Sequence, residues 1–234
     1  MHILYVTIDW YESAVDRNLV FAIAQCRADM CISVYVPLKI YETVDIDKNL
    51  PDNVKVYTSF VLHNRHKFLY KSKLRVLLKD VQETIPDIHS VDLVHSATQC
   101  LGGGVAFVLK KKTGIPYITA IRDTDVNVYY RFLIWQRGVF QKILDHADYV
   151  LFISKVYEQY FINNCIPERK KQSVMAKSGM LQNGIDLVYL SNRKYHYHIF
   201  PKKLVFVGNF SERKNIHGVI EAVKLLREKG YNLT

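Results

Sequence analysis

Four polar side chains follow the apolar run IPYITAI, and they are Arg122, Asp123, Asp125 and Asn127. Polar groups at the end of a buried strand are costly unless they bind a ligand or pair with one another. A guanidinium suits a phosphate or carboxylate, and carboxylates suit sugar hydroxyls, so the cluster predicts a ligand cleft. Capping of the following helix by Asp125 or Asn127 is the competing interpretation, but it does not explain all four residues.

Polar turns also follow other apolar runs. Asp9 lies in TIDWYES after the first run, and Ser154 ends the run ADYVLFIS just ahead of a helical pattern. Ser154 is predicted to cap that helix. The turn QNGID contains Asn183 and Gly184, and Gly184 suits a positive φ. Each of these turns is a weak functional signal by itself.

The stretch VGNFSERKN joins a predicted strand to a predicted helix and begins with Gly208 and Asn209 after its valine. Backbone N–H groups at such a helix N-terminus, together with Lys214, could hold a diphosphate. Many strand–helix turns carry a lysine, so this signal is also weak when taken alone.

The sequence lacks the motifs of several enzyme classes and of common metal sites. It contains no GxSxG, HExxH or P-loop motif. Gly102, Gly103 and Gly104 lack dinucleotide-binding spacing, so they are predicted either to allow close helix packing or to shape a loop near the cleft. His196 and His198 have no adjacent acidic residue or third histidine, so a partly exposed linker is favoured over a metal site.

The four cysteines show no zinc-ligand or redox spacing. The N-terminal MHILYVTIDW has no basic region or cleavage site typical of a signal peptide. We therefore expect reduced, mostly buried thiols and a cytoplasmic protein.

The elements that must position these residues alternate between strands and helices. The predicted strands are HILYVTI, CISVYVP, NVKVYTSF, DLVHS, IPYITAI, DYVLFIS and SVMAK. Helical patterns include residues near 19–24, 68–84, 99–112 and 127–146, and the stretch KVYEQYFIN. This alternation predicts an α/β fold with a Rossmann-like, doubly wound parallel sheet, whose working loops follow the carboxyl ends of the strands.

The alternation of strands and helices stops at residues 187–202, which are polar, aromatic and basic. We interpret this segment as a linker. Residues 1–186 are thus the predicted first domain. KLVFVG and residues 216–229 then predict one further strand and helix, within residues 203–234. One strand and one helix cannot build a core by themselves. We therefore expect residues 203–234 to be only the start of a second Rossmann-like domain, in a truncated chain.

The net charge of +10 raises three classes of partner: nucleic acid, an anionic membrane surface or a phosphorylated substrate. Residues 68–84 form a basic amphipathic helix that suits a membrane interface, although a solvated helix face is the simpler interpretation. No nucleic-acid-binding motif is present, so nucleic acid is not expected as a partner.

The ordered series DLVHS, GIPYITAIRDTDVN, ADYVLFIS, QNGID and KLVFVGNFSERKNIHGVIEAVKLL resembles family 4 of the glycosyltransferases. The resemblance implies a GT-B fold, with an acceptor-binding first domain and a donor-binding second domain. It also implies transfer of a sugar from a nucleotide-sugar donor to a glycan or lipid-linked acceptor with retention, without a cofactor or bound metal.

On this resemblance, Asp9, Arg122, Asp123, Asp125 and Asn127 are acceptor-cleft candidates, and Asn183 and Gly184 form the interdomain turn. Gly208, Asn209 and Lys214 are the donor-diphosphate candidates. The family's donor-binding carboxylate pair lies beyond Thr234, so we expect the chain to be inactive alone. A non-catalytic partner module derived from such an enzyme is the alternative. The basic helix hints at a lipid-linked intermediate of surface polysaccharide biosynthesis, made by an enzyme peripheral at the inner face of the membrane.

Overall fold

The computed structural model describes residues 1–44, 49–67, 69–185, 187–191, 203–208 and 210–233. The chain divides into two units, Met1–Leu187 and Val188–Thr234. The first unit contains a parallel sheet. The predicted linker falls largely outside the described residues, so the predicted domain boundaries remain predictions.

The sheet of the first unit has seven strands in the order β3-β2-β1-β4-β5-β6-β7, and every pairing is parallel. The strands are β1 (His2–Val6), β2 (Cys31–Lys39), β3 (Val54–Leu62), β4 (Leu93–Ser96), β5 (Tyr117–Ile121), β6 (Tyr149–Phe152) and β7 (Ser178–Met180). The strand order reverses between β1 and β4, which is the switch point where open α/β sheets form a crevice. The predicted α/β class and parallel sheet are confirmed.

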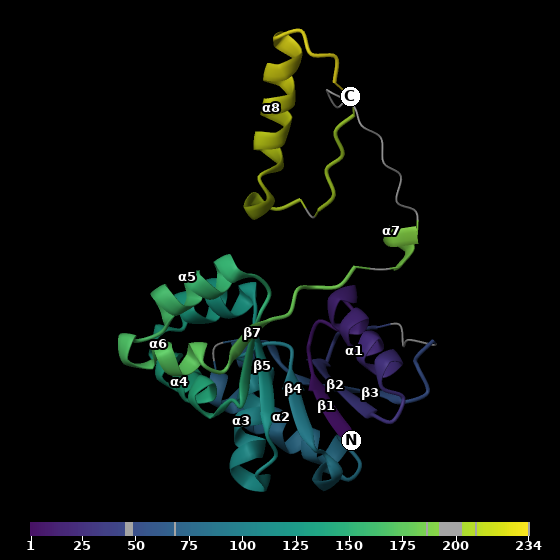
Figure 1. Cartoon of the computed structure of the whole chain (residues 1–234), viewed down its shortest axis with the longest axis vertical. Helices are drawn as coiled ribbons and strands as arrows, with labels where there is room; N and C mark the ends of the chain where they lie inside the picture. The colour runs from purple at the N-terminus through teal and green to yellow at the C-terminus, as the bar shows by residue number, and fades with distance from the viewer. Residues whose placement is uncertain (45–48, 68, 186, 192–202, 209, 234) are drawn as a thin grey trace. The chain divides into compact units, whose positions relative to one another are not determined.

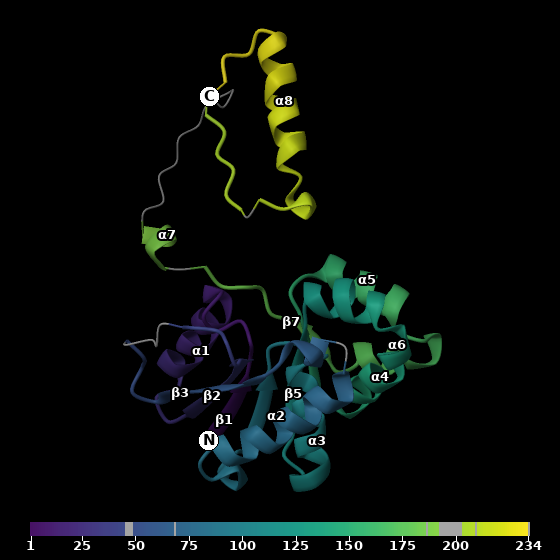
Figure 2. The same ribbon diagram turned by 180° about the vertical axis from the view of Figure 1, so that it is seen from behind.

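Helices cover both faces of this sheet. Figure 1 shows α1 (Ala14–Cys26) on one face, and Figure 2, seen from behind, shows α2 (Tyr70–Thr84) and α3 (Gly102–Thr113) on the other. Val20 and Ala24 of α1 pack in one apolar cluster with Tyr5 of β1. The larger cluster lies under α2, α3, α4 (Arg137–His146), α5 (Lys155–Cys165) and α6 (Glu168–Met175).

The glycine triplet begins α3 and lets this helix approach the sheet closely. A Cβ at Gly102 would lie 3.0 Å from the Val6 carbonyl oxygen, and one at Gly103 would lie 2.8 Å from Thr119 Oγ1. Of the two interpretations, close helix packing is the one that the contacts support. The predicted stop at Gly114 is confirmed, because this residue takes a φ of 79° just after α3.

The predicted helix over residues 127–146 is wrong as one continuous element. A π-helical stretch (Asp125–Tyr130) and a 3-10 turn (Ile134–Gln136) precede α4. The wider π turn lets the rings of Tyr129 and Tyr130 both contact Phe140, with centroids 5.9 and 5.4 Å away. Arg137 Nε donates to the Tyr130 carbonyl at 2.8 Å and satisfies the end of that turn.

Two predicted strands are also wrong. SVMAK lies mostly in α6, which follows Pro167 and has Glu168 in its first turn, as helix N-termini prefer. The strand comes later, as β7. KLVFVG is not a strand over its described residues, 203–208, because none of them pairs with another described strand.

The second unit contains a short helix, α7 (Leu187–Ser191), at its start, a 3-10 turn (Glu212–Lys214) and α8 (Ile216–Glu228). Gly230 follows α8 with a φ of 88°, as expected of a helix stop. Over the described parts of both units, no helix is long and apolar enough to cross a bilayer. Cys26 and Cys31 are exposed, Cys165 is half-buried and Cys100 is buried, so the expectation of mostly buried thiols is only partly met.

Candidate functional site

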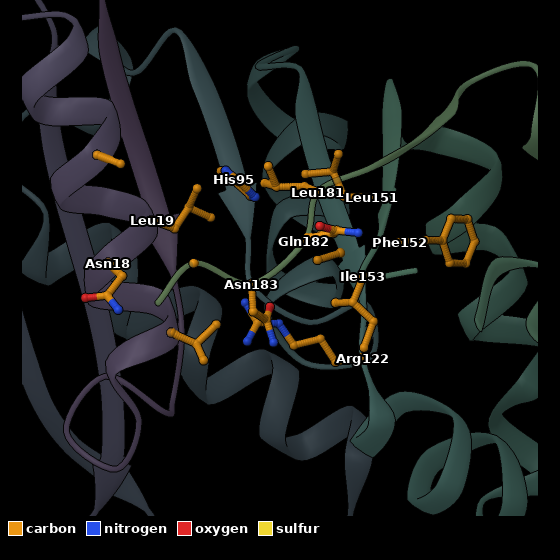
Figure 3. Close-up of a pocket in the computed structure, with 14 residues that line it drawn as sticks. Asn18, Leu19, His95, Arg122, Leu151, Phe152, Ile153, Leu181, Gln182 and Asn183 are labelled. Carbon is orange, nitrogen blue, oxygen red and sulfur yellow. The ribbon is translucent and has the colours of Figure 1, made fainter. Parts of the chain in front are cut away.

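A pocket of about 210 Å³ opens at the carboxyl ends of β4, β5 and β6. One wall is α1, through Val15, Asn18, Leu19 and Ala22, and the opposite wall is the sheet. Figure 3 shows the segment that carries Asn183 running between α1 and the strands, so residues 181–184 form the third wall. The pocket lies beside the switch between β1 and β4, where the fold predicts a ligand site.

A buried carboxylate, Asp16, anchors the polar end of this pocket. It is fully buried in the first turn of α1 and accepts hydrogen bonds from Tyr5 Oη at 3.0 Å and Thr7 Oγ1 at 2.5 Å. Arg122 Nη2 forms an ion pair with its Oδ1 at 2.6 Å. Three elements therefore converge on one side chain: β1, α1 and the turn after β5.

Arg122 is the cation of the pocket and lines it from the end of β5. Its side chain is 18% exposed, and its buried Nε has no hydrogen-bond partner within the described part of the chain. A buried donor without a partner is costly, and a ligand acceptor would satisfy it. The ion pair with Asp16 fixes the guanidinium, so the predicted ligand-facing position of Arg122 fits the geometry.

His95 of β4 provides a second polar group on the sheet wall. Its ring packs edge-on against Tyr5, with centroids 4.9 Å apart. Burial lowers the pKa of His95 to about 4, although Asp16 acts in the opposite direction. The imidazole is therefore neutral near pH 7, and it can exchange a hydrogen bond with a hydroxyl without carrying charge.

The remaining pocket lining is largely apolar. It includes Val15 and Leu19 of α1, Ala120 of β5, Leu151 and Phe152 of β6, Ile153 and Leu181. Amide groups come from Asn18, Gln182 and Asn183. An apolar surface with a few convergent polar groups is typical of sites that bind small organic molecules.

Asp125 lies apart from this pocket and has a supporting function. Its buried carboxylate accepts backbone N–H bonds from Gln99 at 3.2 Å, Cys100 at 2.8 Å and Arg122 at 2.9 Å. Burial raises the pKa of Asp125, and these hydrogen bonds oppose that shift. Asp125 is not the N-cap residue of the following helix; its carboxylate reaches back to Arg122 N and also ties the loop before α3 to this turn.

Asp123 and Asn127 lie on the outside of the same turn. Asn127 is exposed and donates from Nδ2 to Asp123 Oδ1 at 2.7 Å. Asp9 is half-buried after β1, and burial together with the carboxylates of Asp16 and Glu12 raises its pKa. None of the three lines the pocket, so their acceptor-cleft assignment stays a prediction.

The predicted turn residues Asn183 and Gly184 both line the pocket. Gly184 does not have the positive φ expected of it, since among the described glycines only Gly114 and Gly230 do. The chain at 181–185 forms no hydrogen-bonded turn and runs past α1, where a Cβ at Gly184 would meet only Asn18 at 3.8 Å. The predicted cap at Ser154 is confirmed by a bond from Tyr157 N at 3.2 Å.

The donor-diphosphate candidates belong to the second unit. Gly208 precedes the 3-10 turn that ends at Lys214, and Asn215 caps α8 by accepting from Gly218 N at 3.3 Å. Asn209 lies outside the described residues. The described residues also include no cluster of three or more His, Cys, Asp or Glu side chains that could hold a metal ion.

Sequence reasoning missed Asp16 and His95. Asp16 has the position of an ordinary acidic residue in a helix first turn, where a solvent-facing side chain is the usual outcome. His95 could have been found by strand parity, since it alternates with the buried Val94 and Ser96 and so faces α1. Asn18 and Gln182 carry no comparable signal.

Comparisons with known proteins find two relatives that are named as glycosyltransferases. No family model matches the chain. The chain is 27% identical over 146 residues to a Bacillus subtilis protein named "Putative teichuronic acid biosynthesis glycosyltransferase", covering 58% of this chain and 35% of that one. It is 26% identical over 172 residues to an uncharacterized glycosyltransferase of Methanocaldococcus jannaschii, covering 72% and 44%. The chain thus spans less than half the length of these curated relatives, and it is glycosyltransferase-like in sequence.

Solved structures show weaker likeness. A sucrose-phosphate synthase structure from Thermosynechococcus elongatus has a TM-score of 0.49 at 11% identity, covering 82% of this chain and 94% of that one. Anabaena HepE, in complex with UDP and glucose, has a TM-score of 0.47 at 13% identity, covering 80% and 46%. Both scores lie below 0.5, so neither likeness bears on function.

Proposed function

We propose that this chain is the acceptor-side part of a glycosyltransferase of the GT-B type. The enzyme moves a sugar from a nucleotide-sugar donor to a glycan or lipid-linked acceptor with retention of configuration. The observation that carries the proposal is the pocket between α1 and β4–β6, with a fixed guanidinium and a neutral imidazole on mostly apolar walls. Sequence similarity to two glycosyltransferases supports the reaction class.

Each polar group of the pocket has a use in this reaction. Arg122 binds an acceptor oxygen, and the charge of Asp16 offsets its own, so that a neutral sugar is not excluded. His95 and the amides of Asn18 and Gln182 suit hydroxyl groups, which both donate and accept. The apolar walls suit the carbon-bound face of a sugar ring or the start of a lipid carrier.

The donor belongs to the second unit in this proposal. Backbone N–H groups at the 3-10 turn and the Lys214 ammonium bind the diphosphate of the nucleotide sugar. No cofactor or metal takes part in the proposed transfer, and the protein works in the cytoplasm.

Incubation of the chain with UDP-, GDP- and ADP-sugars tests the donor assignment. We expect one nucleotide class to raise the melting temperature of the chain. Lys214→Ala should need about ten times more ligand for the same rise, as expected for the loss of a charge-assisted contact. Lys229→Ala, just beyond α8, is the matched control and should leave the shift unchanged. The donor assignment is wrong if a nucleotide sugar stabilises both variants alike, or if none stabilises either this chain or the complete protein.

A further inference from the structure

Two segments of the first unit hold most of the net positive charge. Residues 63–79 contain six Lys or Arg residues, residues 128–144 contain three, and neither segment contains Asp or Glu. The whole chain has 32 basic and 22 acidic residues, so the charge outside these segments is only +1. The excess charge is therefore local, and it belongs to two stretches that are far apart in sequence.

The two segments meet in the folded chain. Tyr70, the first residue of α2, packs its ring 6.3 Å from Tyr129 and 5.3 Å from Phe140. Tyr129 and Phe140 also contact each other at 5.9 Å. The chain segments that carry the exposed Leu69 and Val128 therefore lie close together.

Large apolar side chains are exposed along the same segments. They are between 48% and 67% exposed, and they are Leu69, Val128, Phe132, Ile134 and Trp135. Val128, Phe132 and Trp135 lie within eight consecutive residues, in the turns ahead of α4. The Arg131 guanidinium lies over the Phe132 ring at 5.4 Å, so charge and apolar surface are interleaved. Clustered apolar exposure of this kind marks an interaction surface.

Two of the three exposed cations along α2 form no ion pair within the described chain. Lys71, Arg75 and Lys79 lie at four-residue intervals along α2, and only Lys79 forms an ion pair within the described chain, at 3.7 Å with Glu83. Burial and the charge of Lys39 lower the pKa of Lys73 to about 8, since no carboxylate balances that ammonium. An anionic partner would relieve this repulsion.

We propose that residues 63–66, 69–79 and 128–144 form a docking surface for an anionic lipid bilayer, with Phe132, Ile134 and Trp135 inserted at the headgroup level. Bilayer interfaces take aliphatic, tryptophan and cationic side chains together. A nucleic acid would use the cations and the aromatic rings but would gain little from Leu69, Val128 and Ile134. The docking surface would bring the enzyme to acceptors held in a membrane. Membrane binding can be tested independently of sugar transfer.

Tryptophan fluorescence tests the proposal on the intact chain. There are two tryptophans; Trp10 is fully buried and Trp135 is 67% exposed, so a change of emission on binding reports on Trp135. With vesicles of phosphatidylcholine and phosphatidylglycerol we expect a blue shift and quenching by brominated lipid chains. Phosphatidylcholine vesicles alone should bind much more weakly, and high salt should release the chain from the anionic vesicles.

Variants separate the two contributions in vesicle co-sedimentation. Arg131→Gln should weaken binding about fivefold, the effect of one cation near an anionic surface. Phe132→Ser should weaken it by roughly tenfold or more. The controls are Lys112→Gln at the end of α3 and Val156→Ser on α5, both exposed, and neither should change binding.

Three results would overturn the proposal. The first is the absence of any emission shift with anionic vesicles. The second is an equal or larger shift with RNA or DNA, which would assign the surface to nucleic acid. The third is lipid-free self-association that Phe132→Ser abolishes, which would make the surface an interface between copies of the chain.

Discussion

At the residue scale, the pocket depends on a contrast between two neighbouring groups. The Arg122 guanidinium forms an ion pair with Asp16 at 2.6 Å, whereas burial lowers the pKa of His95 to about 4 despite the same carboxylate. The site thus presents one fixed cation and one neutral imidazole at neutral pH. That combination recognises hydroxyl and anionic oxygen atoms without requiring a strongly charged ligand.

His95 gives the protein a specific acid sensitivity. Its folded pKa is about 4, against about 6.5 in an unfolded chain, so between these values the unfolded state takes up the proton more readily. The free energy of unfolding should therefore fall as the pH drops from 6.5 to 4, by about 3 kcal/mol from this residue across the window. His95→Asn should remove that part of the pH dependence, as measured by urea unfolding at both ends of the window.

The exposed His89→Asn variant is the control for this measurement and should keep the wild-type slope. A His95→Asn protein with the wild-type slope would mean that folding does not lower the pKa of His95. The imidazole would then titrate near neutral pH, and burial would not hold it neutral in the pocket.

At the element scale, α3 approaches the sheet closely, and the loop before α3 donates two backbone hydrogen bonds to Asp125. Gly103→Ala would place a Cβ 2.8 Å from Thr119 Oγ1 and 3.1 Å from Ile143 Cγ2. We expect a loss of about 1–3 kcal/mol of unfolding free energy, the usual cost of overpacking. Gly138→Ala in α4 is the matched change, since its Cβ would meet nothing within 4 Å.

Gly138→Ala should stabilise the chain by about 0.5–1 kcal/mol through helix propensity alone. Chemical denaturation of both variants measures the difference. If the two substitutions change the free energy of unfolding equally, the glycine triplet is not required for close packing of α3 against the sheet.

The elements also show which parts of the fold the sequence could predict. Strands β1 to β6 and the α/β class follow from apolar runs alternating with helical patterns, and β7 was misplaced because SVMAK is short and ambiguous. The π turn before α4 was not predictable, since it arises from ring packing between Tyr129, Tyr130 and Phe140. Tertiary contacts, and not local propensity, decide such a turn.

The pocket was predicted only in part for the same reason. The position of Arg122 directly after a buried strand indicated its function. Asp16 lies 106 residues earlier in the sequence, and only the fold brings α1 next to the end of β5. Asp125 looked like a ligand-facing carboxylate, and only its three backbone donors reveal that it supports the turn. Long-range pairings of this kind leave no spacing signal in a single sequence.

At the scale of the whole molecule, two surfaces of the first unit divide the proposed work. In this account the pocket beside α1 receives the acceptor group, and the basic, apolar surface of residues 63–66, 69–79 and 128–144 brings the protein to a lipid bilayer. The second unit carries the donor candidates Gly208 and Lys214. The chain spans less than half the length of its curated relatives, so transfer itself is proposed for the complete protein.

Sugar binding in the pocket is the most direct test of this account. Saturation-transfer NMR with a panel of monosaccharides, sugar phosphates and oligosaccharides should identify at least one that binds the chain. Ala22→Trp should abolish that binding, because exposed Ala22 lines the pocket and the indole would fill it without touching the Asp16 network. Unchanged binding in Ala22→Trp, or no binding by any sugar to a folded wild-type chain, would contradict the assignment of this pocket to a glycosyl acceptor.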